Sequence, residues 1–418
     1  MKVIYHGLPS PIDMGKLACK DGLSYFQFNP SFLALNINVS PFHLKLTDEV
    51  QVANAGPFEG LHGVFADSLP DGWGLLLMDR YFRENGIEVS TVSPIDRLAY
   101  ISDKAMGALS YELGLGVKKH DELVSIDLLA SESLKVYNGT VDHVISELAI
   151  AGGSPCGARP KVVVGLCDKG NAMTGANLPD GFEHWLVKFP NGASEVDSAE
   201  GSIEYAYSLM AKDAGINFPE TKLITTKDNR YFACKRFDRA DNQRVHMHTF
   251  AGLVGTNFRV PDSDYQLLMK VTHRLVTVET KADTRELLLR MIFNVLSGNK
   301  DDHTKNFSFI IKDGQWRLSP NYDITFNKGI SGQHSMAISG QGKDISFKAI
   351  ATVADLASIP KKEVAEMLLN ISDSLSQWGQ LAKSLDVPKG SIKEIEQYIG
   401  CAIRCAQPAR MEHQGFRP

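Results

Sequence analysis

The chain has 418 residues, of which 43% are hydrophobic and 22% are charged, and its formal net charge is −5. This composition is that of a globular protein with a sizeable core, which excludes a disordered chain, and the acidic balance argues against a protein that works mainly by binding nucleic acid. At roughly 100–200 residues per domain, the length predicts two or three domains or lobes.

Short strands and a helix are expected in the first part of the chain. The segments KVIYHG, SYFQFNP and LALNINVSP, all within residues 1–50, are rich in β-branched and aromatic residues and bounded by turn residues, which predicts strands. Residues 69–85 have helical apolar spacing, with Asp71-Gly72 as the turn before it, and residues 91–112 predict a further helix and strand. We assign residues 1–120 to an N-terminal domain, because a more polar stretch follows from residue 118.

Strands surround one helix in the middle of the chain. KVVVGL, HWLVKFP, KLITTK and RYFACKRF predict strands, and SAEGSIEYAYSLMAKDAG between them predicts a helix. This order favours a small antiparallel sheet with one helix against it. After residue 245 the helical period dominates, over 283–298, 361–385 and 390–406. We therefore predict an α+β fold, with a β-rich small lobe over 121–240 and a helical large lobe over 241–418.

Cysteine spacing and hydropathy exclude several kinds of protein. The six cysteines form no CxxC pair, so neither a zinc site nor a disulfide framework is indicated. No segment has the ~20 apolar residues of a membrane helix, and the first residues lack the apolar core of a signal peptide. We expect a cytoplasmic protein with no membrane partner.

The segment GNKDDHTKNFSFII carries the most informative pattern. Asp301 and Asn306 form a D-x-x-x-x-N loop, which can supply a carboxylate to deprotonate an attacking hydroxyl and an oxygen ligand for Mg²⁺. Asp323 follows two predicted strands separated by the turn Lys312-Asp313-Gly314, and such a hairpin would bring a second metal ligand back beside Asn306. Taken alone, an Asp–Asn pair in a loop is more often a turn or a cap. The joint pattern favours phosphoryl transfer.

Three upstream segments stand in the order that phosphoryl transfer requires. Lys188, in the strand WLVKFP, could reach phosphates, and Glu204 in the next helix could hold it in place, although in isolation an exposed pair is the better interpretation. The run CKRFDR fits either a connector whose backbone faces adenine or the end of a surface strand. The glycine cluster from Gly152 to Lys161 could wrap phosphates, but it matches neither standard glycine-loop motif.

With these residues in place, the chain resembles the HipA family, the kinase toxins of type II toxin–antitoxin modules, over nearly its whole length. FADSLPDGWGLLLMDRYF is similar to the family's N-terminal domain signature, and GGSPCGARPK is similar to its phosphate loop. LVKFP, EYAYSLMAKDAGINFPETKL, KRFDR, NKDDHTKNFSF and SPNYD are similar to its successive kinase motifs. The resemblance implies a bilobal protein-kinase-like fold, related to lipid kinases, with an extra N-terminal domain.

The resemblance also implies roles for individual residues. Asp301 would be the catalytic base, and Asn306 and Asp323 would hold Mg²⁺. The implied ATP-binding residues are Cys156, Gly157, Ala158, Arg159, Pro160 and Lys161 over the phosphates, Lys188, then Lys235, Arg236 and Phe237 at the adenine, and His303, Lys305 and Tyr322.

Two acidic or phosphorylatable residues near these motifs add to the prediction. Ser154 is the equivalent of the serine whose autophosphorylation shuts family kinases off, and a phosphate there would repel nucleotide. Asp302 puts a second carboxylate beside Asp301, so which of the two acts as base is open on the sequence alone.

The resemblance implies a protein substrate, with an aminoacyl-tRNA synthetase as the candidate, and neutralisation by a helix-turn-helix antitoxin. The chain has no basic recognition-helix pattern, so we expect the antitoxin to be a separate protein and DNA to be contacted only through it. Two other interpretations stay open: a small-molecule or lipid kinase, and a non-catalytic nucleotide-binding module on the same scaffold.

Overall fold

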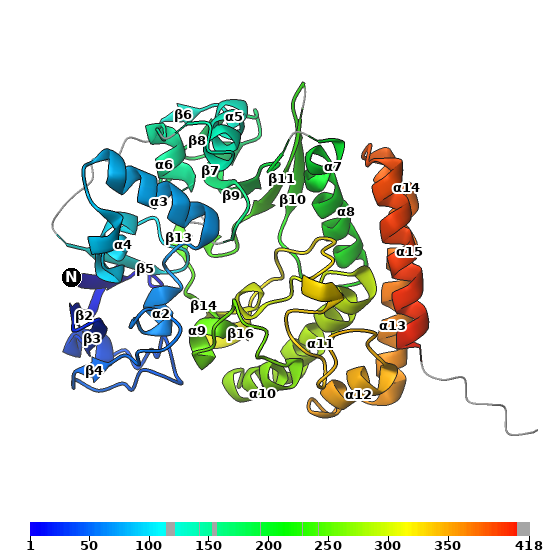
Figure 1. Cartoon of the computed structure of the whole chain (residues 1–418). Coiled ribbons are helices and arrows are strands. Elements are labelled where there is room, and N and C mark those ends of the chain that lie inside the picture. Colours follow the sequence, from blue (N-terminus) through cyan, green and yellow to red (C-terminus); the bar gives the residue numbers. More distant parts are fainter. Residues whose placement is uncertain are drawn as a thin grey trace, which may run out of the picture. The chain divides into compact units, whose positions relative to one another are not determined.

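The computed structural model describes residues 1–113, 122–141, 143–152, 157–192, 194–227, 229–240 and 242–407. The chain divides into two compact units, each built from three segments. Helices and strands are labelled in Figure 1. The first unit contains residues 1–201, 219–257 and 307–315, and the second contains residues 202–218, 258–306 and 316–418.

The first unit begins with a five-stranded antiparallel sheet in the order β4-β3-β2-β1-β5. Its strands alternate buried and exposed residues, as expected for a sheet with one face on a core. That core is rich in aromatic side chains, among them Tyr5, Phe26 and Phe65. The elements are β1 (Lys2–Tyr5), β2 (Ile12–Lys20), β3 (Leu23–Phe28), α1 (Pro30–Leu33), β4 (Gln51–Val52), α2 (Gly63–Ala66), α3 (Gly72–Glu84), η1 (Val89–Thr91), α4 (Pro94–Ile101) and β5 (Leu109–Glu112).

A six-stranded sheet in the order β10-β11-β9-β7-β8-β6 completes the first unit's framework. Its central strand β7 is buried along nearly its whole length, which suits the apolar run KVVVGL. The strands are β6 (Leu123–Val124), β7 (Lys161–Cys167), β8 (Ala172–Met173), β9 (Phe182–Lys188), β10 (Thr221–Thr225) and β11 (Arg230–Lys235), and the helices nearby in sequence are α5 (Ile126–Tyr137), α6 (Ser146–Gly152) and α7 (Glu195–Ser198).

Short strands connect this sheet to the rest of the first unit. The strands β12 (Arg239–Ala240) and β13 (Gln243–Arg244) pair with each other, and β14 (Met247–Thr249) pairs with β15 (Ser308–Lys312). Helix α9 (Phe250–Val254) follows β14 directly and packs against α2.

The second unit is a helical assembly around α11, which contacts α10, α12, α13 and α15. Nearly all residues of α11 from Asp283 onward are buried, so this helix forms the centre of the unit. The elements are α8 (Glu200–Asp213), α10 (Tyr265–Leu275), α11 (Thr280–Ser297), η2 (Thr304–Asn306), β16 (Gln315–Leu318), η3 (Ile330–Gly332), α12 (Phe347–Asp355), α13 (Lys361–Leu375), α14 (Trp378–Ser384) and α15 (Lys389–Ala406). The first two residues of α8 and the first residue of β16 belong to the first unit. Within the described residues, no helix is long and apolar enough to cross a membrane.

Most expected elements are present, with two differences. The predicted strand LALNINVSP is wrong: α1 occupies Pro30–Leu33 and turns follow it. Asn29 caps this helix by accepting from the Ser31 amide at 3.1 Å, and Pro30 at the first helical position fixes the backbone for a helix. The helix predicted over 361–385 is divided into α13 and α14. The domain boundaries at 120 and 240 stay predictions.

Candidate functional site

The two acidic residues of the central motif lie in the loop after α11. This helix ends at Gly298 in a left-handed conformation, with φ at 77°. A Cβ atom on Gly298 would come within 2.7 Å of the Tyr398 ring. Glycine is therefore required at this position, both for its backbone conformation and for space. The chain can then leave the helix directly toward Asp301 and Asp302.

The side chain of Asp302 is buried and hydrogen-bonded, whereas the neighbouring Asp301 is exposed. The Asp302 carboxylate is 1% exposed and accepts hydrogen bonds from the Tyr265 hydroxyl (2.8 Å), from Nδ1 of His334 (2.8 Å) and from the Ser335 amide (2.9 Å). Asp301 is exposed. A buried carboxylate committed to three donors cannot approach the hydroxyl of another molecule. The geometry therefore favours Asp301, which stays the predicted base.

Asn306 is fastened to the backbone that carries Asp301. Its Nδ2 donates to the carbonyl oxygen of Asp301 at 2.6 Å, and its own amide donates to the His303 carbonyl at 2.8 Å. The side-chain oxygen of Asn306 is then the atom that would serve a metal. The Tyr322 hydroxyl donates to the Lys305 carbonyl at 2.7 Å and so ties the segment before Asp323 to the same loop.

Asp323 adopts a backbone conformation that is costly for a residue with a side chain. Its φ is 58°, in the left-handed region, which costs about 1–2 kcal/mol for a non-glycine residue. Such strain gathers at functional sites. The side chains of Asp323 and Asn306 are both hard oxygen donors. Mg²⁺ typically takes one or two protein oxygens together with phosphate and water. The donor set therefore fits Mg²⁺, and no richer cluster of metal-ligating side chains occurs among the described residues.

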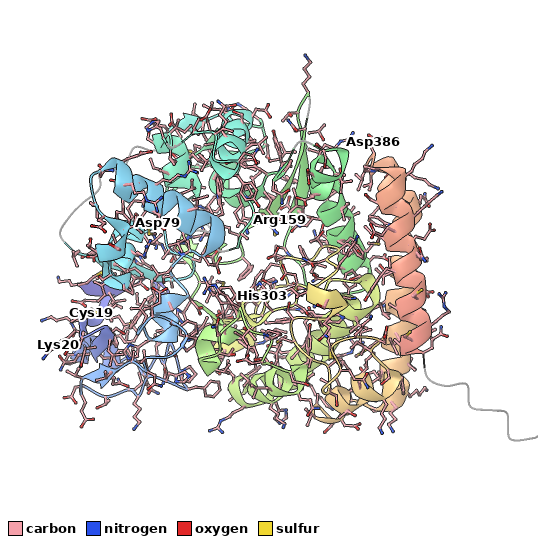
Figure 2. All side chains as sticks on the ribbon, in the orientation of Figure 1. Cys19, Lys20, Asp79, Arg159, His303 and Asp386 are labelled. Atoms are coloured by element: carbon pink, nitrogen blue, oxygen red, sulfur yellow. The ribbon has the colours of Figure 1, made fainter. Side chains whose placement is uncertain are left out.

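Positive charges gather around one aromatic ring beside the loop. The Lys305 ammonium lies 4.3 Å and the Arg259 guanidinium 4.5 Å from the centre of the Phe258 ring. The ring of His303, labelled in Figure 2, lies 5.6 Å from the same ring. Phe258 thereby orients two cations by cation–π attraction. Lys305 and His303 were predicted from the motif, whereas Phe258 and Arg259 were not.

In the first unit, two lysines stand opposite each other on neighbouring strands. The register of β7 and β9 pairs Lys161 with Lys188, and that of β9 and β11 pairs Lys188 with Phe232. The Lys188 ammonium lies 5.8 Å from the Phe232 ring centre. Directly paired residues of an antiparallel sheet share a face, so both lysines belong to the same side of the sheet. Two cationic side chains on one face suit the predicted role of binding phosphates.

The predicted phosphate loop is described from Gly157 onward. Gly157 has φ at 102°, and a Cβ atom on it would lie 2.2 Å from the Lys161 ammonium. This backbone conformation favours glycine, and a larger residue would also force the Lys161 side chain to move. Arg159, labelled in Figure 2, pairs with Glu200 at 3.1 Å. Ser154 and Cys156, predicted as the autophosphorylation site and as part of the loop, lie outside the described residues.

In the predicted adenine segment, two backbone amides are already hydrogen-bonded to other parts of the protein. The Lys235 amide donates to the Glu220 carbonyl and the Arg236 amide to the His184 carbonyl, both at 2.9 Å. An adenine contact from the backbone of these two residues would therefore come from their carbonyl groups. The Lys235 side chain pairs with Glu183.

Arg236 and its partner form a buried ionic group behind this segment. The guanidinium binds Asp238 through two hydrogen bonds of 2.9 and 2.7 Å, and Arg239 binds the same carboxylate at 2.9 Å. Burial raises the pKa of Asp238, but the charges of the two arginines outweigh it and hold that pKa well below its usual range. The Arg236 side chain is thus structural, and only its backbone could contact adenine.

Glu204, predicted to pair with Lys188, is buried in α8. Glu204 belongs to the second unit and Lys188 to the first. Their ion pair stays a prediction.

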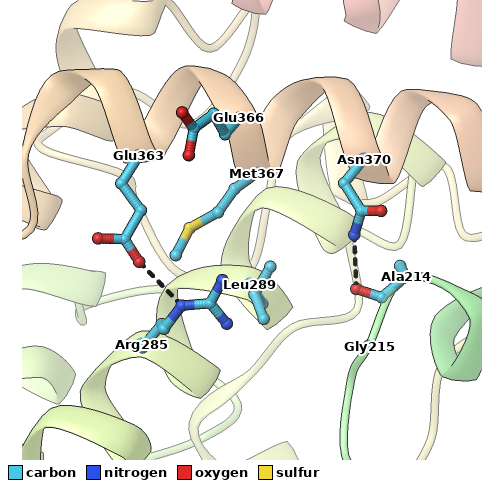
Figure 3. A pocket seen from close by; sticks show the side chains of 8 residues that line it. All are labelled: Ala214, Gly215, Arg285, Leu289, Glu363, Glu366, Met367 and Asn370. Carbon is cyan, nitrogen blue, oxygen red and sulfur yellow. Dashed lines mark hydrogen bonds and ion pairs between the residues drawn. The ribbon is translucent and has the colours of Figure 1, made fainter.

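A cavity of about 300 Å³ in the second unit contains none of the predicted site residues (Figure 3). Figure 3 shows the Arg285–Glu363 pair at 2.8 Å on one side and the Asn370 amide donating to the Ala214 carbonyl at 2.9 Å on the other. These groups satisfy each other, so the cavity carries no reactive chemistry. The site of interest is the loop from Asp301 to Asn306.

We compared the chain with protein families, curated proteins and solved structures. Residues 6–112 match the family described as the HipA N-terminal domain, and residues 153–378, more than half of the chain, match the HipA-like C-terminal domain. The chain belongs to the HipA family. Among curated relatives, "Putative kinase Y4dM" of Sinorhizobium fredii is 29% identical over 44% of this chain and 45% of that protein. "Toxin YjjJ" of Escherichia coli is 28% identical over 36% of this chain and 34% of that protein.

This chain therefore spans less than half the length of these curated relatives. Among solved structures, a chain of the HipA–HipB–operator DNA complex of the Shewanella oneidensis MR-1 toxin–antitoxin system gives a TM-score of 0.69, with 15% identity, over 97% of this chain and 96% of that chain. At that identity the likeness concerns the fold. The predicted α+β kinase-like fold with an additional N-terminal domain is confirmed, as is membership of the HipA family.

Several structural partners of the site could not be predicted. Tyr265 and His334, which hold Asp302, are distant from it in sequence and carry no motif. Asp71 and Trp73 were noted only as a turn and part of a signature, yet both contact the predicted phosphate loop. Pairing between distant segments was the missing information, and a single sequence does not contain it.

Proposed function

We propose that this HipA family member is an ATP- and Mg²⁺-dependent serine/threonine protein kinase that acts as the toxin of a toxin–antitoxin module. The observation that carries the proposal is the contrast between adjacent carboxylates: Asp302 is buried in a hydrogen-bonded cage, while Asp301 is exposed on a loop that Asn306 braces. A general base must reach a foreign hydroxyl, and its position must be fixed by neighbours.

In the proposed reaction, Asp301 accepts the proton of the attacking serine hydroxyl as that oxygen attacks the γ-phosphorus of ATP, with ADP as the leaving group. Asn306 and Asp323 would hold Mg²⁺, which when bound neutralises charge on the phosphates. Lys161 and Lys188 would supply positive charge to the phosphates of ATP. Lys305 adds a cation on the catalytic loop itself.

We further propose Ser154 as an autophosphorylation site. It precedes Gly157 and Lys161 in the loop assigned to the ATP phosphates. A phosphate at Ser154 would add nearly two negative charges there and would compete with ATP for the same cations.

The proposed partners are a protein substrate, with an aminoacyl-tRNA synthetase as the candidate, and a separate helix-turn-helix antitoxin that mediates any contact with DNA. Support for the antitoxin comes from the Shewanella oneidensis complex, which contains HipA, HipB and operator DNA.

Mass spectrometry after incubation with Mg²⁺-ATP tests the proposal. We expect a phosphate on Ser154 of the wild-type protein and none on the Asp301→Ala variant. If ATP binds by calorimetry and neither Ser154 nor an added protein acceptor gains phosphate, the protein kinase assignment is wrong, and the outcome supports a small-molecule kinase or a binding module. If ATP does not bind to protein whose mass excludes prior phosphorylation, every nucleotide-dependent role is excluded.

A further inference from the structure

The first residues of α3, in the N-terminal domain, form hydrogen bonds with the predicted phosphate loop of the small lobe. Residues 71–73 and 157–161 all belong to the first unit. Asp71 is the N-cap residue of α3, yet its side chain makes no capping hydrogen bond. Its carboxylate instead accepts a hydrogen bond from the Gly157 amide. A residue type that ordinarily caps its own helix is thus used on a distant loop, and such departures from local rules gather at functional sites.

Trp73 holds the same loop at two further points. Its backbone amide, which has no acceptor within the first turn of α3, donates to the Gly157 carbonyl at 3.0 Å. Its indole Nε1 donates to the Lys161 carbonyl at 2.9 Å, and the side chain is 1% exposed. Three hydrogen bonds from Asp71 and Trp73 therefore fix both ends of the segment from Gly157 to Lys161.

The fit between the two segments leaves no room for larger residues. A Cβ atom on Gly72 would lie 2.6 Å from the Ala158 Cα, and Gly72 has φ at 45°. Trp73 and Leu77 also share a hydrophobic cluster with Val162 of β7. Helix α3 is therefore part of the hydrophobic core next to this segment, and the two are closely packed.

We propose that Asp71 and Trp73 are positioning residues for the nucleotide: they hold the loop in its phosphate-binding conformation, so the N-terminal domain sets the affinity for ATP. This role rests on the proposed kinase function. A glycine-containing loop loses much conformational freedom when it closes on a ligand. A loop ordered beforehand avoids that loss, and one that is competent only part of the time binds ATP more weakly by that fraction.

The test is the steady-state KM for ATP of Trp73→Phe, with Trp378→Phe as matched control. Trp378 is also 1% exposed and its indole Nε1 also donates to a backbone carbonyl, that of Ile392 at 3.1 Å, but it lies in α14 of the second unit. We expect Trp73→Phe to raise the KM for ATP about five- to tenfold, with kcat within about twofold, while Trp378→Phe loses comparable thermal stability without that rise.

Two variants of Asp71 provide a second comparison. Asn retains an oxygen that can accept from the Gly157 amide, whereas Ala does not. We expect Asp71→Asn to keep a KM near that of the wild type and Asp71→Ala to raise it. Amide exchange of residues 157–161 without nucleotide should accelerate in Trp73→Phe and Asp71→Ala alone.

The outcomes separate the two proposals. If the wild type transfers phosphate in an Asp301-dependent manner but Trp73→Phe raises the KM no more than Trp378→Phe, the positioning role is overturned and the kinase stands. If the wild type neither binds ATP nor transfers phosphate, the proposed function fails, and the positioning role fails with it.

Discussion

Two buried aspartates, one in each unit, are held by the same kind of hydrogen-bond arrangement. In the first unit, Asp67 accepts from Nδ1 of His248 (2.5 Å) and from the amide and hydroxyl of Thr249 (both 2.7 Å). In the second unit, Asp302 accepts from Nδ1 of His334, from the Ser335 amide and from the Tyr265 hydroxyl. Each cage thus contains a histidine, the amide of the next residue and a hydroxyl.

The cages differ in what surrounds them. Nε2 of His248 lies 3.1 Å from the Ser40 hydroxyl, which completes a buried Ser–His–Asp arrangement that joins the N-terminal domain to β14. All three side chains are buried, so no substrate can reach the serine. The second cage instead stands next to the exposed Asp301. The comparison teaches that the same hydrogen-bond arrangement can stabilise a buried contact in one unit and, in the other, a loop that presents an exposed carboxylate, the proposed base.

The largest expected effect separates Asp301 from both caged acids. Asp301→Asn should lower the rate of phosphate transfer by about 10²- to 10⁴-fold, because the general base is lost. Its free energy of unfolding should change by no more than about 0.5 kcal/mol, because the side chain is exposed. Radiolabel transfer and urea denaturation measure the two quantities. An active Asp301→Asn would contradict the assignment of the base.

The caged acids should show the reverse pattern. Asp67→Asn and Asp302→Asn should each lower the free energy of unfolding by about 2–4 kcal/mol, because an amide presents a donor to groups that are themselves donors. Hydrogen exchange should localise the damage to β14 in the first variant and to residues 298–306 in the second. Asp301→Asn serves as the exposed control. Equal stability of all three variants would remove the distinction.

Acid should weaken the Asp67 region through its additional histidines. Burial, aided by the charge of His248, lowers the pKa of His246 to about 3, and burial lowers the pKa of His62 to about 4. An unfolded histidine has a pKa of about 6.5, so below that pH the unfolded state binds protons first. Stability present above about pH 6.5 is therefore lost as pH falls, by about 1.4 kcal/mol per pH unit for each histidine.

Urea denaturation at a series of pH values checks this with His246→Gln. Gln can still donate to the Val39 carbonyl, which lies 2.9 Å from Nε2 of His246. We expect the variant to lose stability more gently than the wild type between about pH 6.5 and pH 5, with a difference of about 2 kcal/mol at the lower value. Parallel curves would show that the pKa of His246 is the same in the folded and unfolded protein, which would contradict the predicted lowering.

The smallest expected effects come from removing one hydroxyl near each buried aspartate, that of Tyr265, which donates to Asp302, and that of Ser40, which contacts His248. Tyr265→Phe should lower the free energy of unfolding by about 1.5 kcal/mol and Ser40→Ala by about 1 kcal/mol, since the first hydroxyl donates to a carboxylate and the second does not. Only Tyr265→Phe should also reduce phosphate transfer, because it loosens the residue next to Asp301. Reduced transfer in Ser40→Ala at unchanged ATP affinity would contradict this division.

Local patterns in the sequence predicted much of the fold. The helical periods gave α3, α8, α11 and α15, and the β-branched runs gave β7, β9 and β11, because these elements are decided by which residues face a core. The strand predicted for LALNINVSP failed at its start because Leu33 belongs to α1, a helix that Asn29 caps and Pro30 begins, and turns follow this helix. The order and spacing of the kinase motifs were sufficient to nominate Asp301, Asn306 and Asp323.

The rest of the site depends on contacts between distant segments. The choice between Asp301 and Asp302 required the positions of Tyr265 and His334, and the contact of Asp71 with Gly157 joins two domains of the sequence. Asp301 and Asp302 are the same residue type, so the sequence alone does not show which of them is exposed and which is buried. Ser154 stays a prediction from the family resemblance.

The hydrogen bond from Trp73 to Lys161 also gives the protein a built-in optical reporter. The chain has four tryptophans, and Trp73 is the one whose indole nitrogen binds the backbone of the phosphate loop. Indole emission responds to the polarity and charge around the ring, so binding of a polyanion beside Lys161 would change the intrinsic fluorescence without any added label. With Trp73→Phe as the blank, a titration would follow occupancy of the loop alone, in the intact chain and in real time.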